Sequence, residues 1–387
     1  MLNFEFGNPT RIIFGRGTHR EVGQQVKKYA KKVLLHYGGK SIKASGVYDA
    51  IIASLKEAGV EYTELGGVQP NPRLKLVYEG VSICKEQGID FILAVGGGSV
   101  IDSAKAIAVG ARYDGDVWDF YSNIARPNGA LNIGVVLTIP AAGSESSDGS
   151  VITKEAGAYK RSCCTDWMYP KFAVLNPELC YTLPHNQISA GGADILAHIM
   201  ERYFTNTTHT DFSDRLCEAA MRSVMENLLK VKQDTQNYDA WAEVMWGGTV
   251  AHNGLLGKGR QEDWASHGIE HELSGIYDIA HGAGLAIIFP AWMKYVYKTN
   301  LNRFVQFAVR VFDVDMAYES LEEIALEGIR RLERFFTSLG LAVTLSQAGI
   351  GSKDFTVMAQ KACENGPVGS FKRLEPLDVE QIFKLAE

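Results

Sequence analysis

The stretch that most constrains the fold is an apolar strand that leads directly into a glycine run and a helix. Residues 91–95 are all apolar, which is the pattern of a fully buried strand. Residues 96–99 read Gly-Gly-Gly-Ser, and the following residues to about 108 have the composition of a helix. Open α/β sheets bind ligands at the carboxyl ends of their strands. This order therefore predicts an α/β fold with a mainly parallel, helix-covered sheet.

The glycine run has the properties of a pyrophosphate site. Gly96, Gly97 and Gly98 let the backbone turn sharply and approach a ligand closely, and Ser99 adds a hydroxyl donor. The helix that follows directs free N–H groups and a partial positive charge at the same place. The alternative is a glycine-rich turn without a ligand. The run is neither the Gly-x-Gly-x-x-Gly fingerprint nor a Walker A loop, and it lacks the last glycine of a hydrolase Gly-x-Ser-x-Gly elbow.

The residues after an earlier strand predict which dinucleotide binds. Enzymes that use NAD usually carry an acidic side chain after a strand, where it bonds the ribose 2′-hydroxyl. Here the strand at residues 33–37 is followed by Gly38, Gly39, Lys40 and Ser41. No carboxylate stands there to repel a 2′-phosphate, and Lys40 and Ser41 could bind one. The sequence therefore predicts NADP(H), with a solvated surface lysine at position 40 as the alternative.

The secondary structure that the sequence predicts changes near the middle of the chain. With 387 residues it is expected to form two domains, because single cores seldom exceed roughly 250–300 residues. Strand-like runs stop before Leu183, and long helical patterns follow. We expect an α/β dinucleotide-binding domain over residues 1–184 and an all-helical metal-binding domain over residues 185–387. Expected strands cover 11–15, 32–37, 61–65, 91–95, 132–139, 150–153 and 171–175, the last two around a turn at Ala156-Gly157; expected helices cover 19–30, 47–58, 73–87, 186–204, 211–229, 239–255 and segments from 291, 321 and 354.

The second half holds a candidate metal site. Asp194 and His198 are four residues apart, a spacing that places both side chains on one face of a helix. With His267 and His281 they could supply one carboxylate oxygen and three imidazole nitrogens, leaving a position open for substrate. The alternative is a helix with one buried polar pair and unrelated histidines.

A rival interpretation uses the pattern His-x-x-Glu-His at residues 267–271, which is typical of some zinc peptidases. In that interpretation His267 and His271 bind zinc and Glu270 is the general base. Gly268 is a poor helix former, and the glycine run would have no role. A non-catalytic module that binds a nucleotide or a metal is the third alternative.

Composition excludes several classes of protein. The net charge of −6 and the absence of a Lys/Arg block argue against a nucleic-acid binder. No apolar run reaches the ~20 residues of a membrane span, and the first residues lack the features of a signal peptide. The six cysteines show no Cys-x-x-Cys spacing. We therefore expect a reduced protein in the cytoplasm.

Three motifs and the histidines together resemble one enzyme family. Residues 96–105, 137–145 and 192–198, with His267, His271 and His281, are similar to the iron-containing (group III) alcohol dehydrogenases over essentially the whole chain. The likeness is greatest to the branch of NADPH-dependent butanol dehydrogenases and aldehyde reductases. It implies a dehydroquinate synthase-like fold, with a cleft between the two domains, and a homodimer. The implied substrate is a small alcohol or aldehyde, by default short-chain and aliphatic such as butanol or butanal.

The resemblance also implies roles for individual residues. Asp194, His198, His267 and His281 would bind the metal, with Fe²⁺ expected first and Zn²⁺, Co²⁺ or Ni²⁺ left open. His271 would lie near the nicotinamide and the substrate and assist proton transfer. Ala141-Ala142 stands where many members have Gly-Thr, so the resemblance does not carry over the pyrophosphate contact of that threonine, a position at which the aldehyde-reductase branch varies. The cofactor would be lined by Asn71, Gly96, Gly97, Gly98, Ser99, Asp102, Thr138, Ser147, Lys160 and Leu179.

Overall fold

The computed structural model describes residues 1–317 and 320–387. Contacts along the chain define two compact units. An α/β unit contains Gly7–Leu183 and Asp234–Asn253, and a helical unit contains Met1–Phe6, Pro184–Gln233 and Gly254–Glu387. The division into folding domains at residues 184 and 185 stays a prediction.

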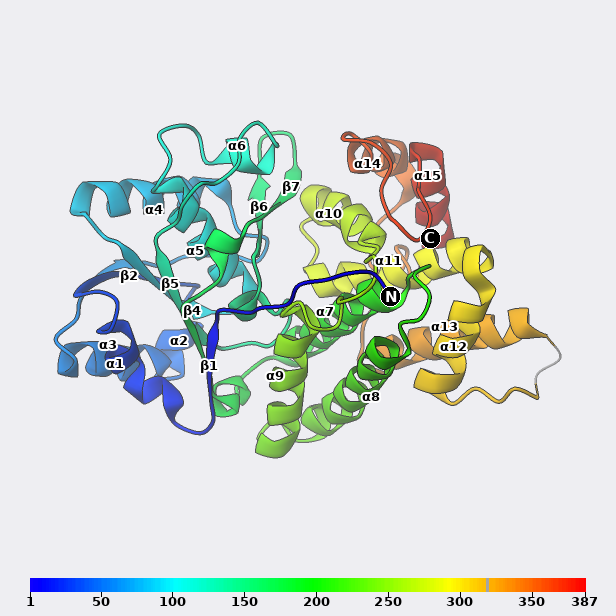
Figure 1. Cartoon of the computed structure of the whole chain (residues 1–387), viewed down its shortest axis with the longest axis horizontal. Helices are drawn as coiled ribbons and strands as arrows, with labels where there is room; N and C mark the ends of the chain where they lie inside the picture. The colour runs from blue at the N-terminus through cyan, green and yellow to red at the C-terminus, as the bar shows by residue number, and fades with distance from the viewer. Residues whose placement is uncertain (318–319) are drawn as a thin grey trace. The chain divides into compact units, whose positions relative to one another are not determined.

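The α/β unit is built on a six-stranded parallel sheet with the strand order β1-β8-β5-β4-β2-β3 (Figure 1). Tyr37 pairs with Val95, Gly96 with Leu137, and Leu137 with Leu175, so the carboxyl ends of four neighbouring strands meet at one edge. The predicted parallel sheet is confirmed. Its strands are β1 (Arg11–Phe14), β2 (Lys32–Tyr37), β3 (Glu61–Leu65), β4 (Phe91–Gly96), β5 (Asn132–Leu137) and β8 (Phe172–Leu175).

Helices cover both faces of this sheet (Figure 1). Successive strand side chains point to opposite faces, so Leu35 of β2 packs with α1 and α3 while the neighbouring His36 faces α5 and bonds Ser103 Oγ at 2.9 Å. The helices of one face are α1 (Val22–Val26), α2 (Ser41–Ala44) and α3 (Val47–Glu57), and those of the other are α4 (Leu74–Gln87) and α5 (Gly98–Gly110).

Two expectations for the first half are wrong. The helix predicted over 19–30 is a 3-10 turn, η1 (Thr18–Glu21), followed by the short α1, because Tyr29 N and Ala30 N both bond Val26 O in the turn that leads to β2. The turn at Ala156-Gly157 joins β6 (Gly149–Lys154) to β7 (Tyr159–Cys164) as an antiparallel hairpin, and not to β8. β7 has no apolar run, so its sequence gave no strand signal.

The helical unit is assembled around α7 (His185–Tyr203), which packs against α8 (Asp211–Gln233) and α11 (His281–Val296). Phe204, directly after α7, lies among a cluster of aromatic rings that includes Trp292, Phe304 and Phe371. The other helices of this unit are α10 (Ala265–Tyr277), α12 (Leu301–Phe312), α13 (Leu321–Ser338), α14 (Phe355–Ala362) and α15 (Pro376–Leu385).

The sequence prediction was wrong for two of these helices, both of which contain glycine. α10 forms although Gly268 lies inside it, because its apolar face buries Ile269 and Leu273 completely. α11 begins at His281, ten residues before the predicted start at 291, and Gly282 lies in its first turn. The α/β unit also contains the longer helix α9 (Tyr238–His252). The remaining elements are short: α6 (Trp118–Tyr121) and the 3-10 turns η2 (Ser144–Ser146), η3 (Asp166–Met168), η4 (Pro177–Cys180), η5 (Tyr297–Asn300) and η6 (Ser352–Asp354). Within the described ranges, the helices are too short or too polar to cross a bilayer.

Candidate functional site

The glycine run lies at the carboxyl edge of the sheet, between β4 and α5. Gly97 is the N-cap of α5. A Cβ atom on Gly97 would lie 2.1 Å from Ile139 Cγ2, and one on Gly98 would lie 3.3 Å from Ala142 Cβ. The run therefore packs directly against the segment that follows β5, with Thr138 N bonded to Gly96 O at 3.1 Å. Only glycine at position 97 permits this approach, which leaves the backbone N–H groups of the helix start at the sheet edge.

The residues after β2 lie at the same edge. Gly38 follows Tyr37, the partner of Val95, and its carbonyl accepts Gly67 N at 2.8 Å. Gly39, Lys40 and Ser41 are exposed. The predicted 2′-phosphate residues therefore follow β2, the neighbour in the sheet of the strand β4 that leads into the glycine run.

Asn71 and Lys160 come from distant parts of the sequence but lie on adjoining segments. Thr153 of β6 pairs with Lys160 of β7, and Thr153 N donates to Pro72 O at 2.8 Å. Asn71 has a left-handed backbone with φ 52°, and its carbonyl accepts Arg73 Nη1 at 2.7 Å. Both Asn71 and Lys160 are buried. The β6–β7 hairpin, which contains Lys160, therefore contacts the segment that contains Asn71.

Asp102 has a structural task. Its Oδ1 accepts the Ser144 hydroxyl at 2.6 Å, and its Oδ2 accepts Val151 N at 2.9 Å. Burial raises the pKa of the Asp102 carboxyl above its usual value, although Lys105 and these hydrogen bonds oppose the shift. Ser147 lies in the segment between the two bonded residues, and Leu179 lies in η4 after β8, half-buried against the core.

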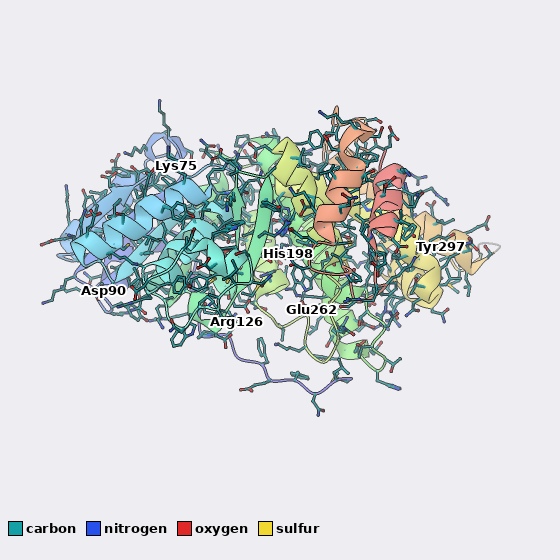
Figure 2. The ribbon with its side chains drawn as sticks, turned by 90° about the horizontal axis from the view of Figure 1, so that it is seen from above. Lys75, Asp90, Arg126, His198, Glu262 and Tyr297 are labelled. Carbon is teal, nitrogen blue, oxygen red and sulfur yellow. The ribbon has the colours of Figure 1, made fainter. Side chains whose placement is uncertain are left out.

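Three of the four predicted metal ligands, Asp194, His267 and His281, bring their ligand atoms together in the helical unit, and the ring of the fourth, His198, lies beside that of His267. Asp194 and His198 are buried one turn apart on α7, with His198 Nδ1 3.0 Å from Asp194 Oδ1. One ligand atom from each of Asp194, His267 of α10 and His281 of α11 lies within 4.8 Å of the others. The rings of His198 and His267 have centroids 4.6 Å apart. Figure 2 shows where His198 lies among the side chains of the unit.

Two sets of contacts bring α7, α10 and α11 together. A Cβ atom on Gly282 would lie 1.9 Å from Ala190 O, so the first turn of α11 touches the backbone of α7 directly. Glu201 of α7 accepts Trp264 N at 2.7 Å and His267 N at 3.0 Å. A carboxylate is favourable at a helix N-terminus, where it satisfies free N–H groups of α10.

Each ligand histidine is held by its Nδ1 atom. His267 Nδ1 bonds Glu201 Oε1 at 2.7 Å, and His198 Nδ1 bonds Asp194 O at 2.9 Å. His281 Nδ1 bonds Glu270, which also accepts the Ser274 hydroxyl. An acceptor on Nδ1 fixes the ring tautomer that carries its lone pair on Nε2. In this tautomer Nε2 is the ring atom that would bind a metal, although His198 is not part of the set whose ligand atoms lie within 4.8 Å of one another.

The protonation states also suit a cation. Burial disfavours the charged form of Asp194, but the nearby His198, His281 and His267 outweigh it and hold the pKa of Asp194 well below its usual range. Burial, reinforced by His198, holds the pKa of His267 well below its usual value, so its ring is neutral. His267 Nε2 is buried without a hydrogen-bond partner among the described residues, and Asp194 Oδ1 faces imidazole nitrogens, with His198 Nδ1 at 3.0 Å and His281 Nε2 at 3.9 Å. Buried polar atoms are rarely left unbonded, so this donor set fits a divalent metal ion.

Glu270 and His271 take different positions from those of a peptidase. The carboxylate of Glu270 is fully buried and engaged by Ser274 and His281, so it does not face a water molecule as a general base must. His271 is half-buried, with its ring centroid 5.5 Å from that of His281. One atom from each of Glu270, His271 and His281 also falls within 4.8 Å of the others, so a second donor set overlaps the first.

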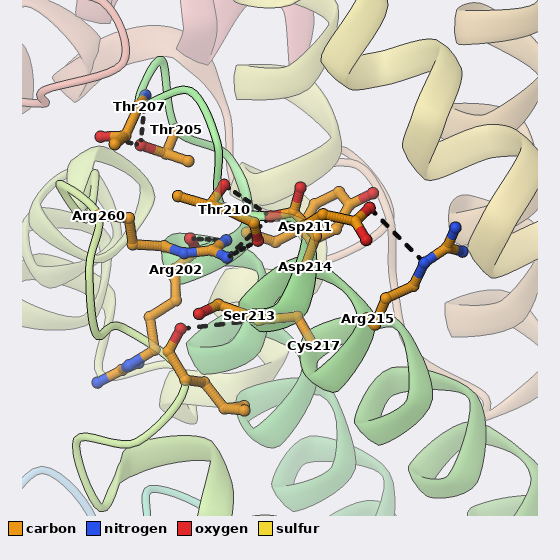
Figure 3. Close-up of polar contacts among 12 residues, drawn as sticks. Arg202, Thr205, Thr207, Thr210, Asp211, Ser213, Asp214, Arg215, Cys217 and Arg260 are labelled. Atoms are coloured by element: carbon orange, nitrogen blue, oxygen red, sulfur yellow. Dashed lines mark hydrogen bonds and ion pairs between the residues drawn. The ribbon is translucent and has the colours of Figure 1, made fainter. Parts of the chain in front are cut away.

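A polar network supports the carboxyl end of α7 (Figure 3). Arg202 Nη1 donates to His198 O at 2.6 Å, and Arg260 Nη1 donates to Arg202 O at 3.1 Å. Arg260 Nη2 lies 2.8 Å from Asp214 Oδ1 in a buried ion pair. Buried pairs of this kind add specificity of arrangement more than stability. These contacts hold in place the turn of α7 that carries His198.

Two carboxylates that hold predicted ligand histidines were not assigned that role from the sequence: Glu201 had no role, and Glu270 appeared only as the general base of the rival interpretation. Glu201 follows Asp194 by seven residues, and Glu270 lies between His267 and His271, so helical spacing placed both carboxylates near the ligands. Lys105 stands in the quoted glycine motif without an assigned role. The available signal was a carboxylate close in sequence to a candidate histidine ligand.

Family models match both halves of the chain. A model described as "Iron-containing alcohol dehydrogenase" matches residues 9–177, and one described as "Fe-containing alcohol dehydrogenase family, C-terminal" matches residues 188–386. These matches span the glycine run and all four predicted metal ligands.

Individual proteins are similar over nearly their whole length. "Probable NADH-dependent butanol dehydrogenase 1" of Bacillus subtilis is 47% identical over 384 residues, 99% of this chain and 99% of that protein. "NADPH-dependent aldehyde reductase YqhD" of Escherichia coli is 36% identical over 369 residues, 95% of this chain and 94% of that protein. The crystal structure of NADH-dependent butanol dehydrogenase A from Thermotoga maritima has a TM-score of 0.96 and 41% identity, covering 100% of this chain and 99% of the other. The expected fold is thereby confirmed.

Proposed function

Because the chain belongs to the iron-containing alcohol dehydrogenase family, we propose that it interconverts a primary alcohol and its aldehyde with a nicotinamide dinucleotide. The proposed reaction is R-CHO + NADPH + H⁺ ⇌ R-CH₂OH + NADP⁺. The observation that carries this proposal is the set of Asp194, His267 and His281, whose ligand atoms lie within 4.8 Å of one another and in which the buried His267 Nε2 has no hydrogen-bond partner in the described part of the chain. Butanal and 1-butanol are the first substrates to test, because similar proteins are named butanol dehydrogenases.

The chain's own residues have distinct tasks in this reaction. Asp194, His198, His267 and His281 would hold the divalent ion, which when bound supplies Lewis-acid polarisation of a carbonyl oxygen. Glu201 and Glu270 keep the His267 and His281 rings in place. His271 would exchange a proton between the substrate site and solvent. The hydride carrier is the nicotinamide, which the sheet edge of the α/β unit would bind.

We further propose the residues that line the cofactor. Backbone N–H groups at the start of α5 suit the pyrophosphate, and the loop after β2 suits the adenosine ribose. The proposed lining residues are Gly38, Gly39, Lys40, Ser41, Asn71, Gly96, Gly97, Gly98, Ser99, Asp102, Thr138, Ser147, Lys160 and Leu179.

Turnover of butanal by reconstituted protein tests the function. Metal-stripped protein is loaded separately with Fe²⁺, Zn²⁺, Co²⁺ or Ni²⁺, and NADPH consumption is measured. We expect turnover with at least one ion, Fe²⁺ first, and none after chelation. Dinucleotide binding without turnover on any of several aldehydes would indicate a non-catalytic module. Casein cleavage without NADPH consumption would restore the peptidase interpretation.

The choice of NADP(H) over NAD(H) is a finer proposal. Its support is the loop after β2, where exposed Lys40 and Ser41 stand without a carboxylate. Similar proteins include both NADH-dependent and NADPH-dependent enzymes by name. We expect Lys40→Ala to lower kcat/KM for NADPH roughly tenfold, the effect of losing one charge-assisted hydrogen bond, with kcat/KM for NADH unchanged.

Lys43 provides the matched control for that variant. It lies on the same short helix but faces Glu64 at 3.6 Å and the Tyr48 ring at 4.5 Å. Lys43→Ala should leave the NADPH to NADH ratio unchanged. Wild-type protein with an equal or higher kcat/KM for NADH would refute the proposed preference.

Two properties of the intact protein complete the proposal. We propose a homodimer, supported by the position of β1 at an edge of the sheet, where its backbone can pair with a second strand. Sedimentation analysis of wild-type protein tests it. We propose a cytoplasmic location, supported by six free cysteines, and cell fractionation tests it.

A further inference from the structure

Lys105 is a fully buried lysine at the cofactor edge of the sheet, and the proposed reaction gives it no role. Its side chain is 0% exposed. Its Nζ donates to Ser147 O and Gly149 O, both at 2.8 Å, and lies 3.3 Å from Ser147 Oγ. An ammonium has three donors, and here each has an acceptor. Burying such a charge is costly, so its complete bonding points to a specific task.

Asp102 lies one turn earlier on the same helix and contacts the same segment. Its carboxylate accepts Ser144 Oγ at 2.6 Å and Val151 N at 2.9 Å, and its backbone carbonyl accepts Ser150 Oγ at 2.8 Å. Asp102 therefore binds both ends of residues 144–151, and Lys105 binds the middle. We call this segment the α5-bound loop.

The start of α5 is the glycine run itself, with Gly97 as its N-cap. One helix thus presents the predicted pyrophosphate site at its first turn and holds the α5-bound loop one to two turns later. The loop contains Ser147, a proposed cofactor residue. The hydrogen bonds of Asp102 and Lys105 therefore attach this loop to the helix that begins at the glycine run.

The electrostatics keep Lys105 charged at neutral pH. Burial lowers the pKa of Lys105 to about 8, and Asp102, Asp148 and Glu145 oppose that shift. The ammonium therefore lies near three carboxylates, of which Glu145 is buried and Asp102 and Asp148 are half-buried. A neutral side chain of the same length would leave the carbonyls of Ser147 and Gly149 without their donor.

We propose that Lys105 is a positioning residue for the nicotinamide dinucleotide, because it holds the backbone of Ser147 and Gly149 against the helix that starts at the glycine run. This inference rests on the proposed function, since it assumes that the dinucleotide binds at that edge. The inference predicts that Lys105 affects the binding of the dinucleotide and not the rate of the chemical step.

The test compares Lys105→Met with Lys85→Met in the complete, metal-loaded protein. Lys85 Nζ donates to Tyr113 O at 2.6 Å, so it too holds a backbone carbonyl, but beyond the far end of α5. NADPH binding is measured by fluorescence titration, together with kcat, KM and amide hydrogen exchange over residues 144–151. We expect Lys105→Met to raise the Kd and KM for NADPH about tenfold or more, because charge-assisted bonds are lost. Its kcat at saturating NADPH should stay within about twofold, and the loop should lose amide protection; Lys85→Met should change none of these.

An unchanged Kd in folded Lys105→Met protein overturns the inference, as does a fall in kcat with Kd unchanged. If that variant does not fold, Ser144→Ala removes a single bond to Asp102 and should raise the Kd roughly threefold, the effect of one ordinary hydrogen bond. An unchanged Kd for Ser144→Ala then overturns it instead. Wild-type protein run in the same titration separates the two proposals. Absence of dinucleotide binding and turnover in wild type refutes the proposed function and this inference together.

Discussion

The two functional regions meet opposite electrostatic demands. The proposed cofactor site, at the carboxyl edge of the sheet in the α/β unit, contains a glycine run with backbone N–H groups, and its predicted 2′-phosphate residues are exposed to solvent. The proposed metal site of the helical unit contains buried Asp194 and His267 and half-buried His281, and both histidine rings are held by a carboxylate. An anion can be bound by backbone dipoles without desolvating a protein charge. A cation centre needs a buried carboxylate, and neutral imidazoles that are kept neutral. The glycine run should therefore be most sensitive to added atoms, and the proposed metal site to lost charges and donors.

The largest effect is expected at the centre itself. His267→Ala removes a buried nitrogen that has no protein partner within the described residues, so the remaining donors cannot complete the site. We expect loss of bound metal, measured by elemental analysis, and turnover below detection, while dinucleotide binding to the α/β unit persists. His185→Ala is the control, because His185 begins the same helix as Asp194 but is exposed. Full metal content in the His267 variant would remove it from the ligand set.

His271 separates proton handling from metal binding within the same centre. His271→Ala should retain the metal and lower kcat roughly 10²-fold, a typical effect of removing a general acid or base. The KM of this variant for NADPH should equal that of the wild type. Loss of the metal from this variant would make His271 a ligand and favour the overlapping set of Glu270, His271 and His281. Metal analysis and kinetics on one preparation distinguish these outcomes.

The same contrast explains what the sequence could predict. The strand at 91–96 and the glycine run were predictable because a fully buried strand leaves a continuous apolar run and backbone chemistry leaves glycines. Asp194 and His198 were predictable as a pair because helical spacing is local. β7 was not, because its polar residues pair through the backbone alone.

Residues that act through other residues were the hardest to predict. Glu201 holds His267 across 66 positions, and Lys105 reaches the α5-bound loop across 42. Such contacts depend on how elements pack, which periodicity within one element does not encode. α10 illustrates the same limit, because the burial of Ile269 and Leu273 overrides the low helix propensity of Gly268.

At the cofactor edge, one added methyl group tests the role of backbone approach. Gly97→Ala places a Cβ atom 2.1 Å from Ile139 Cγ2, so the run must shift away from the segment after β5. Overpacking of this kind costs ~1–3 kcal/mol, which corresponds to a rise of roughly 5- to 150-fold in the Kd for NADPH if the strain falls on the binding loop. Metal content should be unchanged. Gly129→Ala, where an added Cβ meets only Arg112 Cβ at 4.0 Å, should bind NADPH like wild type.

The smallest expected effect reports on a residue that touches neither substrate nor cofactor. Glu201→Gln keeps the shape of a carboxylate that holds the His267 ring and caps α10, but replaces one of its acceptor oxygens by a donor. We expect metal affinity, measured by chelator competition, to fall about tenfold, the lower end of the range for such supporting groups. Glu226→Gln on the exposed face of α8 is the matched control. Unchanged affinity in the Glu201 variant would show that helix packing alone orients His267, and that the centre depends on its supporting carboxylates less than the edge depends on its glycines.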